Sequence, residues 1–311
     1  MAIQEMDAAV VDLELVDQKA TSIAKHYYEL TKPGITQMVA LSTLAGYYLA
    51  VPGDLAVYAA SSAHWFHFLA TMVGTIAISS GSCVVNHIME KDADGVMKRT
   101  AKRPLPAGII SVSQATVFAV VLTLLGVALL ATTNMLTCGL AIATWLSYVV
   151  VYTPMKSKSS LAVFVGGIPG ALPFAGGWTA VRGTIDPITL ALFAILFFWQ
   201  LPHFYALSWM YRADYKAGGF VLRAINDESG RTLGIQMIIT SLLTLAAIVV
   251  PTILGATGWL YLAGSVVLGL WLTAESALFV RKADASAARR VLLTSYAVLM
   301  GVILLMFLDK Q

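Results

Sequence analysis

The chain has 311 residues, of which 58% are hydrophobic and only 12% are charged. Soluble domains carry roughly twice that share of charged residues, so the composition excludes an ordinary soluble enzyme and indicates a membrane protein. The two cysteines, Cys83 and Cys138, lie in apolar stretches, so neither a disulfide scaffold nor a Cys-rich metal site is indicated. Nucleic acid is not expected as a partner.

The N-terminal segment differs from the rest of the chain. Residues 1–20 contain five acidic residues and one lysine. Because acidic residues predominate there, we expect residues 1–24 to form a flexible acidic tail and not a secretory signal peptide. Residues 25–311 are expected to form a single integral-membrane domain.

Apolar stretches of about the length needed to cross a bilayer, roughly 18–20 residues, recur along the chain. They cover residues 35–52, 65–85, 113–131, 135–153, 161–181, 187–206, 235–255, 259–279 and 291–308. Because the bilayer core offers no water to backbone polar groups, each stretch must be a helix. The sequence therefore predicts an all-α membrane protein with about nine transmembrane helices.

The distribution of basic residues supports this count. With nine spans, 18 of the 20 lysines and arginines fall on one side, and only Arg182 and Lys310 fall on the other. The positive-inside rule then places the N-terminus and the basic loops in the cytoplasm, and the C-terminus on the opposite side. The loops that follow the second and the sixth span also contain acidic residues, and both lie on this basic side. We therefore expect the active site at the cytoplasmic face.

The loop after the second span carries the first group of candidate site residues. Asn86, Glu90 and Asp94 are spaced at i, i+4 and i+8, so a continuing helix would align them in one stripe of oxygen ligands. Asp92 projects from another face unless the helix unwinds near Gly95. Four basic residues follow, namely Lys98, Arg99, Lys102 and Arg103.

These residue types favour Mg²⁺ and phosphate oxygens as ligands. Hard carboxylate and amide oxygens suit Mg²⁺, which typically takes one or two carboxylates together with phosphate oxygens. The arginines suit bidentate contacts with phosphate. The alternative is a solvated loop whose basic residues only set topology, which would leave the acidic stripe unexplained.

The loop after the sixth span carries a second group, which faces the same side because four spans separate the two loops. Asp214 is expected at the aqueous rim, where a carboxylate requires a cation, and His203 is expected deeper in the bilayer. His203 has two open interpretations: a ligand or orienting group, or a packed histidine that is hydrogen-bonded inside the membrane.

At these residues the sequence resembles a known family. The spacing Asn86-x₃-Glu90-x₃-Asp94 resembles the N-x₃-D-x₃-D signature of the UbiA superfamily of intramembrane prenyltransferases. Other runs are similar to the protohaem IX farnesyltransferase (haem O synthase) family within it. These runs are 30–36, 97–104, 152–156, 170–173 with 177–178, 199–204 and 214–218.

The resemblance implies a UbiA-type bundle in a bacterial cytoplasmic (inner) membrane and an Mg²⁺-dependent transfer of a farnesyl group. The donor would be farnesyl diphosphate, the acceptor a vinyl group of haem b, and the products haem O and diphosphate, for haem–copper oxidases. Haem A synthase or other oxidase assembly proteins would be partners. The implied metal and catalytic residues are Asn86, Glu90, Asp94 and Asp214, with Asp92 as a further metal ligand; the implied substrate-binding residues are Lys32, Arg99, Arg103, Lys156, Tyr152, His203, Tyr211 and Arg212.

Three departures from the family pattern accompany the match. Glu90 stands where the family usually has Asp. Ser157-Lys158-Ser159-Ser160 follows Lys156 where the family usually has a second basic residue and then Arg-Thr, and Phe220-Val221-Leu222 stands in place of Pro-Met-Leu. Rival interpretations are a prenyltransferase for an aromatic quinone precursor, a polytopic transporter, and a haem-handling assembly factor without turnover. A transporter would concentrate polar groups near mid-membrane, whereas these acidic residues lie at the membrane edge.

Overall fold

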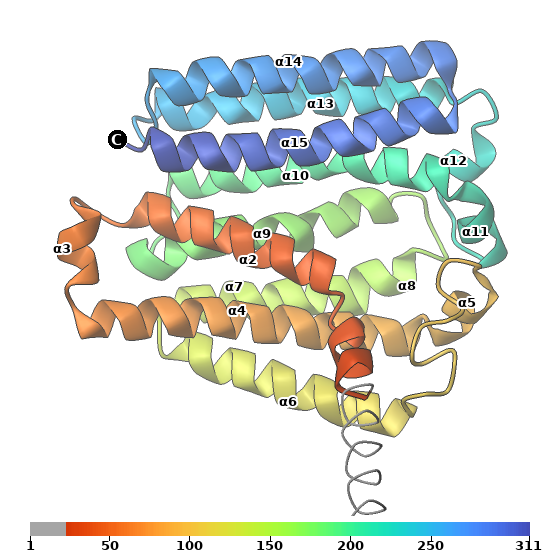
Figure 1. Cartoon of the computed structure of the whole chain (residues 1–311), viewed down its shortest axis with the longest axis horizontal. Coiled ribbons are helices and arrows are strands. Elements are labelled where there is room, and N and C mark those ends of the chain that lie inside the picture. Colours follow the sequence, from red (N-terminus) through yellow and green to blue (C-terminus); the bar gives the residue numbers. More distant parts are fainter. Residues whose placement is uncertain (1–22) are drawn as a thin grey trace, which may run out of the picture.

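The computed structural model of the protein describes residues 23–311 (Figure 1). The predicted tail, 1–24, therefore lies outside the described residues apart from its last two. These two residues begin a helical segment over 23–30.

Long helices dominate the described part of the chain, which contains no β-strand. The long helices are α2 (Pro33–Ala50), α4 (Ser62–Met89), α6 (Val112–Ala131), α7 (Met135–Leu146), α9 (Ala162–Arg182), α10 (Pro187–Met210), α13 (Arg231–Ile253), α14 (Trp259–Lys282) and α15 (Ala285–Leu308). Each overlaps one predicted span, so the prediction of an all-α protein with about nine membrane helices is confirmed. Within residues 23–311, seven helical spans, counting α7 and its extension as one, are long and apolar enough to cross a membrane, judged by length and composition alone. Helices α2 and α9 are not among these seven.

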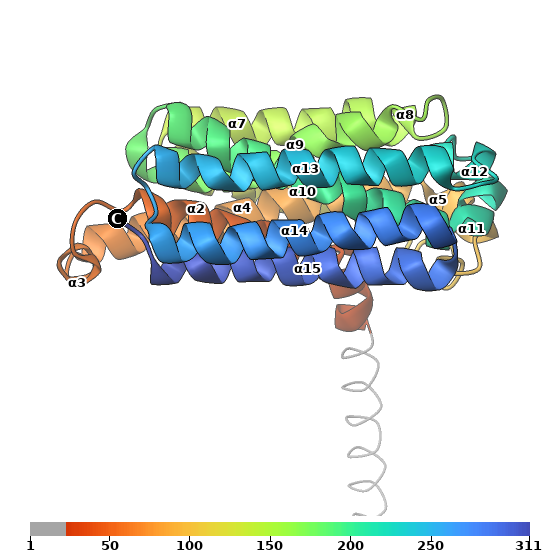
Figure 2. The same ribbon diagram turned by 90° about the horizontal axis from the view of Figure 1, so that it is seen from above.

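The long helices run roughly parallel or antiparallel, and the short elements gather at the two ends of the bundle (Figures 1 and 2). The C-terminus and α3 (Leu55–Ala59) lie at one end. The opposite end, which we call the site end, carries α5 (Lys91–Val96), α8 (Thr153–Met155), α11 (Arg212–Ala217) and α12 (Arg223–Asn226). The two acidic loops therefore lie at the same end, as the alternation of spans predicts.

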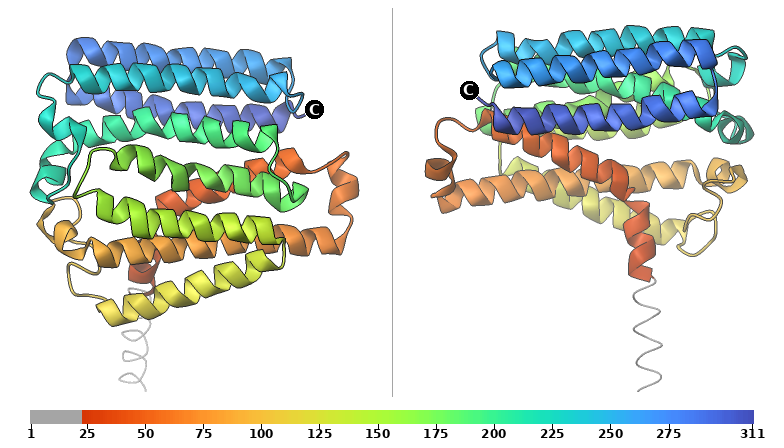
Figure 3. Two further views of the ribbon diagram at one scale, coloured as in Figure 1. Left: turned by 180° about the vertical axis from the view of Figure 1, so that it is seen from behind. Right: turned by 45° about the horizontal axis from the view of Figure 1, so that its top comes forward.

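A bend at Lys32 sets the start of the first long helix. Pro33 disfavours the right-handed helical conformation in the residue before it, and Lys32 adopts a left-handed one with φ 50° and ψ 65°. The segment 23–30 consequently points away from the axis of α2 (Figure 3). Backbone conformations of this kind cost free energy in a residue other than glycine, and they are frequent at functional sites.

A second irregularity extends α7 toward the site end. The helix widens into a π-helix, η1 (Ser147–Tyr152), and then continues as α8. Pro154 in α8 has no backbone N–H to donate to the preceding turn, which is a recognised cause of such distortions. The wider turn presents Tyr152 and Thr153 toward the residues of the first acidic loop, as described below.

Close contact between α2 and α9 depends on glycine. A Cβ atom at Gly177 would lie 2.0 Å from the carbonyl oxygen of Thr43, and one at Gly46 would lie 2.2 Å from that of Phe174. Small residues permit such backbone contacts between membrane helices. This contact explains how α2 and α9, which are less hydropathic than the other long helices, remain in the bundle.

Replacing Gly177 with alanine should lower the thermal unfolding midpoint in detergent, because the added methyl group would overlap backbone atoms that cannot rotate away. We expect the free energy of unfolding to fall by about 1–3 kcal/mol, the usual effect of overpacking. Gly176→Ala is the matched control, since no atom lies within 4 Å of a Cβ atom built there. Equal midpoints for the two variants would contradict the contact.

Candidate active site

The predicted stripe of oxygen ligands is present at the site end. Asn86 lies in the last turn of α4, Glu90 ends that helix with φ −97° and ψ 7°, and Asp94 lies in α5. The backbone N–H of Asp94 still donates to the carbonyl of Glu90 at 2.7 Å, so the four-residue spacing survives the break. All three side chains are buried, and Asp94 is only 1% exposed.

Each member of the stripe contacts a cationic side chain from a different part of the chain. The cations precede α2, follow α5 and follow α8, so the site assembles only when these three segments meet. The pairs are Lys32 Nζ with Asn86 Oδ1, Lys156 Nζ with Glu90 Oε1 at 2.8 Å, and Arg103 with Asp94 Oδ2 at 2.7 Å.

These contacts hold the charges in place. Burial would raise the pKa of Asp94, but the adjacent His87 and the Arg103 guanidinium outweigh it and hold that pKa at about 2. Burial would likewise raise the pKa of Glu90, and the charges of Lys156 and Lys32 hold it below its usual range. Burial lowers the pKa of Lys32 to about 8, against the attraction of Glu90. The two carboxylates are therefore ionised at neutral pH.

Thr153 and Phe220, which the sequence did not single out as site residues, complete the stripe. Asn86 donates from Nδ2 to Thr153 Oγ1 at 3.0 Å, which fixes the carboxamide with its oxygen toward Lys32. Lys156 lies over the Tyr152 ring at 4.6 Å and the Phe220 ring at 5.8 Å, two favourable cation–π contacts. Thr153 lies in a run that matches the family, but no spacing rule links it to Asn86.

The second acidic loop contacts the first one. Asp214, half-buried in α11, accepts from the backbone N–H of Arg99 at 3.3 Å. The guanidinium of Arg99 lies 5.2 Å from the Tyr211 ring centre, and that of Arg212 lies 4.1 Å from the Trp209 ring centre. The structure therefore brings Asp214, Arg99 and Tyr211 together at the rim, while Arg212 contacts α10.

Two of the predicted site residues lie apart from this arrangement. Asp92 is exposed to solvent, on a different side of α5 from Asp94. His203 is buried in α10 and faces α15, where its Nδ1 lies 2.9 Å from Ser295 Oγ and its ring lies beside Tyr296. This position matches the packed interpretation of His203, and its contact with haem stays a prediction.

The residues present fit a divalent cation that is completed by substrate oxygens. Asp94 Oδ1 is buried and has no hydrogen-bond partner among the described residues. Within residues 23–311, no three His, Cys, Asp or Glu side chains converge into a metal site by themselves. Mg²⁺ is compatible with such a site, because it takes few carboxylates and completes its shell with phosphate oxygens and water.

Fold and site together define an all-helical membrane protein with a paired acid–base array at one end of its bundle. Residues 40–303 match the model of the UbiA prenyltransferase family. The chain is 36% identical over 296 residues to the protoheme IX farnesyltransferase of Solibacter usitatus, which covers 92% of this chain and 99% of that protein. The chain belongs to the UbiA prenyltransferase family, and the resemblance to protohaem IX farnesyltransferases is confirmed.

Solved structures agree on the fold. A structure of digeranylgeranylglyceryl phosphate synthase superposes with a TM-score of 0.73 at 18% identity, covering 92% of this chain and 97% of that one. A UbiA homologue from Archaeoglobus fulgidus bound to GPP and Mg²⁺ superposes with a TM-score of 0.59 at 13% identity, covering 91% and 99%. The UbiA-type bundle expected from the sequence is thus confirmed.

Proposed function

We propose that this chain transfers the farnesyl group of farnesyl diphosphate to a vinyl group of haem b, giving haem O and diphosphate. The observation that carries the proposal is the buried stripe in which each oxygen ligand of α4 and α5 is paired with a cation. Such an array offers carboxylates to a metal and cations to phosphate oxygens at once. The relatives named protoheme IX farnesyltransferase support haem as the acceptor.

Within this proposal the site residues divide into two groups. Asn86, Glu90, Asp94 and Asp214 would hold Mg²⁺, which neutralises diphosphate and makes it a better leaving group. The cations of the site would contact the diphosphate oxygens and stabilise the charge that develops there as the bond to carbon breaks. These cations are Lys32, Arg99, Arg103 and Lys156.

The chemistry needs no nucleophilic side chain and no redox cofactor. The bond between C1 of the farnesyl group and oxygen breaks, and both electrons leave with diphosphate. The vinyl π electrons form the new carbon–carbon bond to C1, and the resulting cation is captured by water, which loses a proton. The product carries a hydroxyethylfarnesyl group.

A cavity beside Lys156 is suited to the reacting end of the prenyl chain. It encloses about 80 Å³, and its walls come from the segment around α8, the start of α9 and the end of α10. Tyr152 and Lys156 line it together with Gly166, Phe204 and Phe220. We propose that C1 of the farnesyl group lies here, with the diphosphate toward Glu90 and the chain extending toward lipid.

The orientation in the membrane follows from the same proposal. The basic loops lie at the site end, so we place that end in the cytoplasm and the C-terminus on the opposite side of a bacterial inner membrane. Haem A synthase and other oxidase assembly proteins are the proposed partners, because a product this apolar requires a membrane-bound acceptor.

The test is a reconstituted assay. Purified protein in lipid receives haem b, farnesyl diphosphate and Mg²⁺, and mass spectrometry should detect haem enlarged by one farnesyl group and one hydroxyl group. EDTA should abolish the product, and added Mg²⁺ should restore it, because the carboxylates alone provide no complete site for diphosphate.

Two outcomes would contradict the proposal. If both substrates bind and no product forms, an assembly factor without turnover becomes the better interpretation. If a phenolic acceptor is prenylated in a metal-dependent reaction and haem is not, the chain acts on a quinone precursor.

A further inference from the structure

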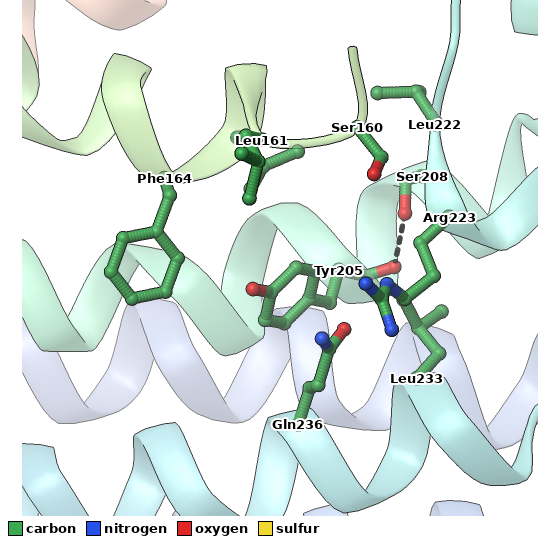
Figure 4. Close-up of a pocket in the computed structure, with 10 residues that line it drawn as sticks. Ser160, Leu161, Phe164, Tyr205, Ser208, Leu222, Arg223, Leu233 and Gln236 are labelled. Carbon is green, nitrogen blue, oxygen red and sulfur yellow. Dashed lines mark hydrogen bonds between the residues drawn. The ribbon is translucent and has the colours of Figure 1, made fainter.

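A second cavity lies beside the proposed prenyl cavity. It measures about 150 Å³ and lies between the start of α9, the end of α10, the loop at α12 and the start of α13 (Figure 4). Val163, Ser208 and Leu222 line both cavities, so they form the wall that the two share. The second cavity contains none of the acidic residues of the proposed active site.

Its polar lining consists mainly of unused hydrogen-bond donors. The guanidinium of Arg223 and the carboxamide of Gln236 both lie next to the ring of Tyr205 (Figure 4). Among residues 23–311, Arg223 has no carboxylate partner, and neither the Tyr205 hydroxyl nor the Gln236 amide nitrogen has an acceptor. The carboxamide oxygen of Gln236 is buried and has no hydrogen-bond partner among the described residues.

The surrounding groups do not satisfy these donors. Asp227 is the nearest acidic residue to Arg223 in the chain, and its carboxylate accepts from the backbone N–H of Leu233 at 2.7 Å, where it caps α13. The hydroxyl of Ser208 donates to the carbonyl of Tyr205 at 2.7 Å. The guanidinium of Arg223 therefore lines the cavity without a protein anion from the described part of the chain, beside the Tyr205 ring and the Gln236 carboxamide, while the Tyr205 hydroxyl points toward the side of Phe164 (Figure 4). An unpaired guanidinium in a cavity is the chemistry of a carboxylate site.

The volume of the cavity and the exposed apolar side chains beside it further limit which ligands could bind. A volume of about 150 Å³ accepts a short carboxylate arm and cannot contain a macrocycle. Two large apolar side chains at the cavity, Leu161 and Phe164, are 60% and 44% exposed. An apolar body could cover them while its carboxylate enters the cavity. The expected ligand is thus an amphipathic carboxylate.

The backbone connects this cavity to the transfer site. The N–H of Val221 donates to the carbonyl of Lys156 at 2.8 Å, two residues before Arg223. Ser160, on the opposite wall, follows Lys156 by four residues. The wall at Arg223 is therefore linked by a backbone hydrogen bond, and the wall at Ser160 by the chain itself, to the lysine that pairs with Glu90.

We propose that this cavity binds a propionate carboxylate of the haem acceptor, with Arg223 as the principal contact. The inference rests on the proposed function, because it assigns a place to one end of that acceptor. Haem carries its vinyl and propionate groups on different edges, so a propionate held at Arg223 would orient the opposite edge toward the cavity beside Lys156.

The test compares haem b with its dimethyl ester, in which both propionates are neutral. The spectral shift of haem on binding gives an affinity that needs no turnover, and product formation gives KM and kcat. The wild-type protein should bind haem b about ten- to a hundredfold more tightly than the ester, the range for a lost charge-assisted hydrogen bond. Arg223→Gln should abolish most of this preference, and Arg223→Lys should restore part of it.

The KM for farnesyl diphosphate should not change in Arg223→Gln, because the cavity is separate from the diphosphate site. Arg289→Gln is the matched control, an exposed arginine of α15 that lines neither cavity.

An unchanged preference in Arg223→Gln would overturn the assignment, as would an equal loss of affinity for acid and ester. A change only in the amount of anionic phospholipid that copurifies would identify a lipid headgroup as the ligand and also overturn it. Failure of the proposed function would look different: haem would bind with the expected preference, and no farnesylated haem would form.

Discussion

Replacing Asp94 with asparagine should reduce farnesyl transfer by at least about a hundredfold, the scale of losses expected when charge stabilisation at a reacting phosphate is removed. Asp94 is 1% exposed, its Oδ2 accepts from Arg103 at 2.7 Å, and its Oδ1 has no partner among the described residues. Asparagine retains the shape but loses the charge that a metal requires. Steady-state rates in lipid at saturating Mg²⁺ would measure the loss.

Asp92 provides the internal comparison for that experiment. It is an exposed carboxylate two residues away in the same helix, so Asp92→Asn should lower the rate several-fold at most. Glu228→Gln, an exposed acid in the loop before α13, controls for the general loss of negative charge at this end of the protein. Equal losses for Asp92→Asn and Asp94→Asn would show that the buried stripe is not the metal site.

Replacing Lys156 with methionine should lower both activity and stability, because Glu90 would remain buried and ionised without its partner. Removing one member of a buried pair costs about 3–5 kcal/mol, and the partial exposure of this lysine reduces the expected cost to about 1–3 kcal/mol. The rate should fall about a hundredfold if Lys156 also contacts diphosphate. Lys158→Met, an exposed lysine two residues later, is the matched control.

A double variant separates the two roles of Lys156. Glu90→Gln combined with Lys156→Met removes both charges, so the unfolding midpoint should return toward that of the wild-type protein while the rate stays low. Recovery of the rate together with the midpoint would assign Lys156 a purely structural role and remove it from the diphosphate site.

The sequence predicted those features that depend on simple periodicities. Apolar stretches long enough to span a bilayer predicted each long helix, and the i, i+4, i+8 spacing predicted the buried stripe of Asn86, Glu90 and Asp94. The alternation of spans placed both acidic loops at one end. These features follow from residue spacing within a single helix and from the number of spans between two loops, so they can be predicted from a single sequence.

Features that depend on contacts between distant segments were not predictable in this way. No spacing rule pairs Lys32 with Asn86 or Thr153 with Asn86, because the partners are separated by 54 and 67 positions. The direction of His203 toward Ser295 depends on how α10 packs against α15. The cavity at Arg223 is likewise formed by four separate segments, and its donors form no local motif.

The pairing of each oxygen ligand with a lysine or arginine has a thermodynamic consequence for how substrates enter. Mg²⁺ alone would have to displace Lys156 and Arg103 from their carboxylates and leave two partly buried cations without partners. Diphosphate alone would leave the carboxylates unpaired in the same way. When Mg²⁺ and diphosphate bind together, the carboxylates gain the metal and the cations gain the phosphate oxygens, so no charged group loses its partner without gaining another. Each ligand should therefore strengthen the binding of the other by the same factor, as reciprocal linkage requires. The protein's own cations thus make binding of the metal and the leaving group a single concerted ion exchange.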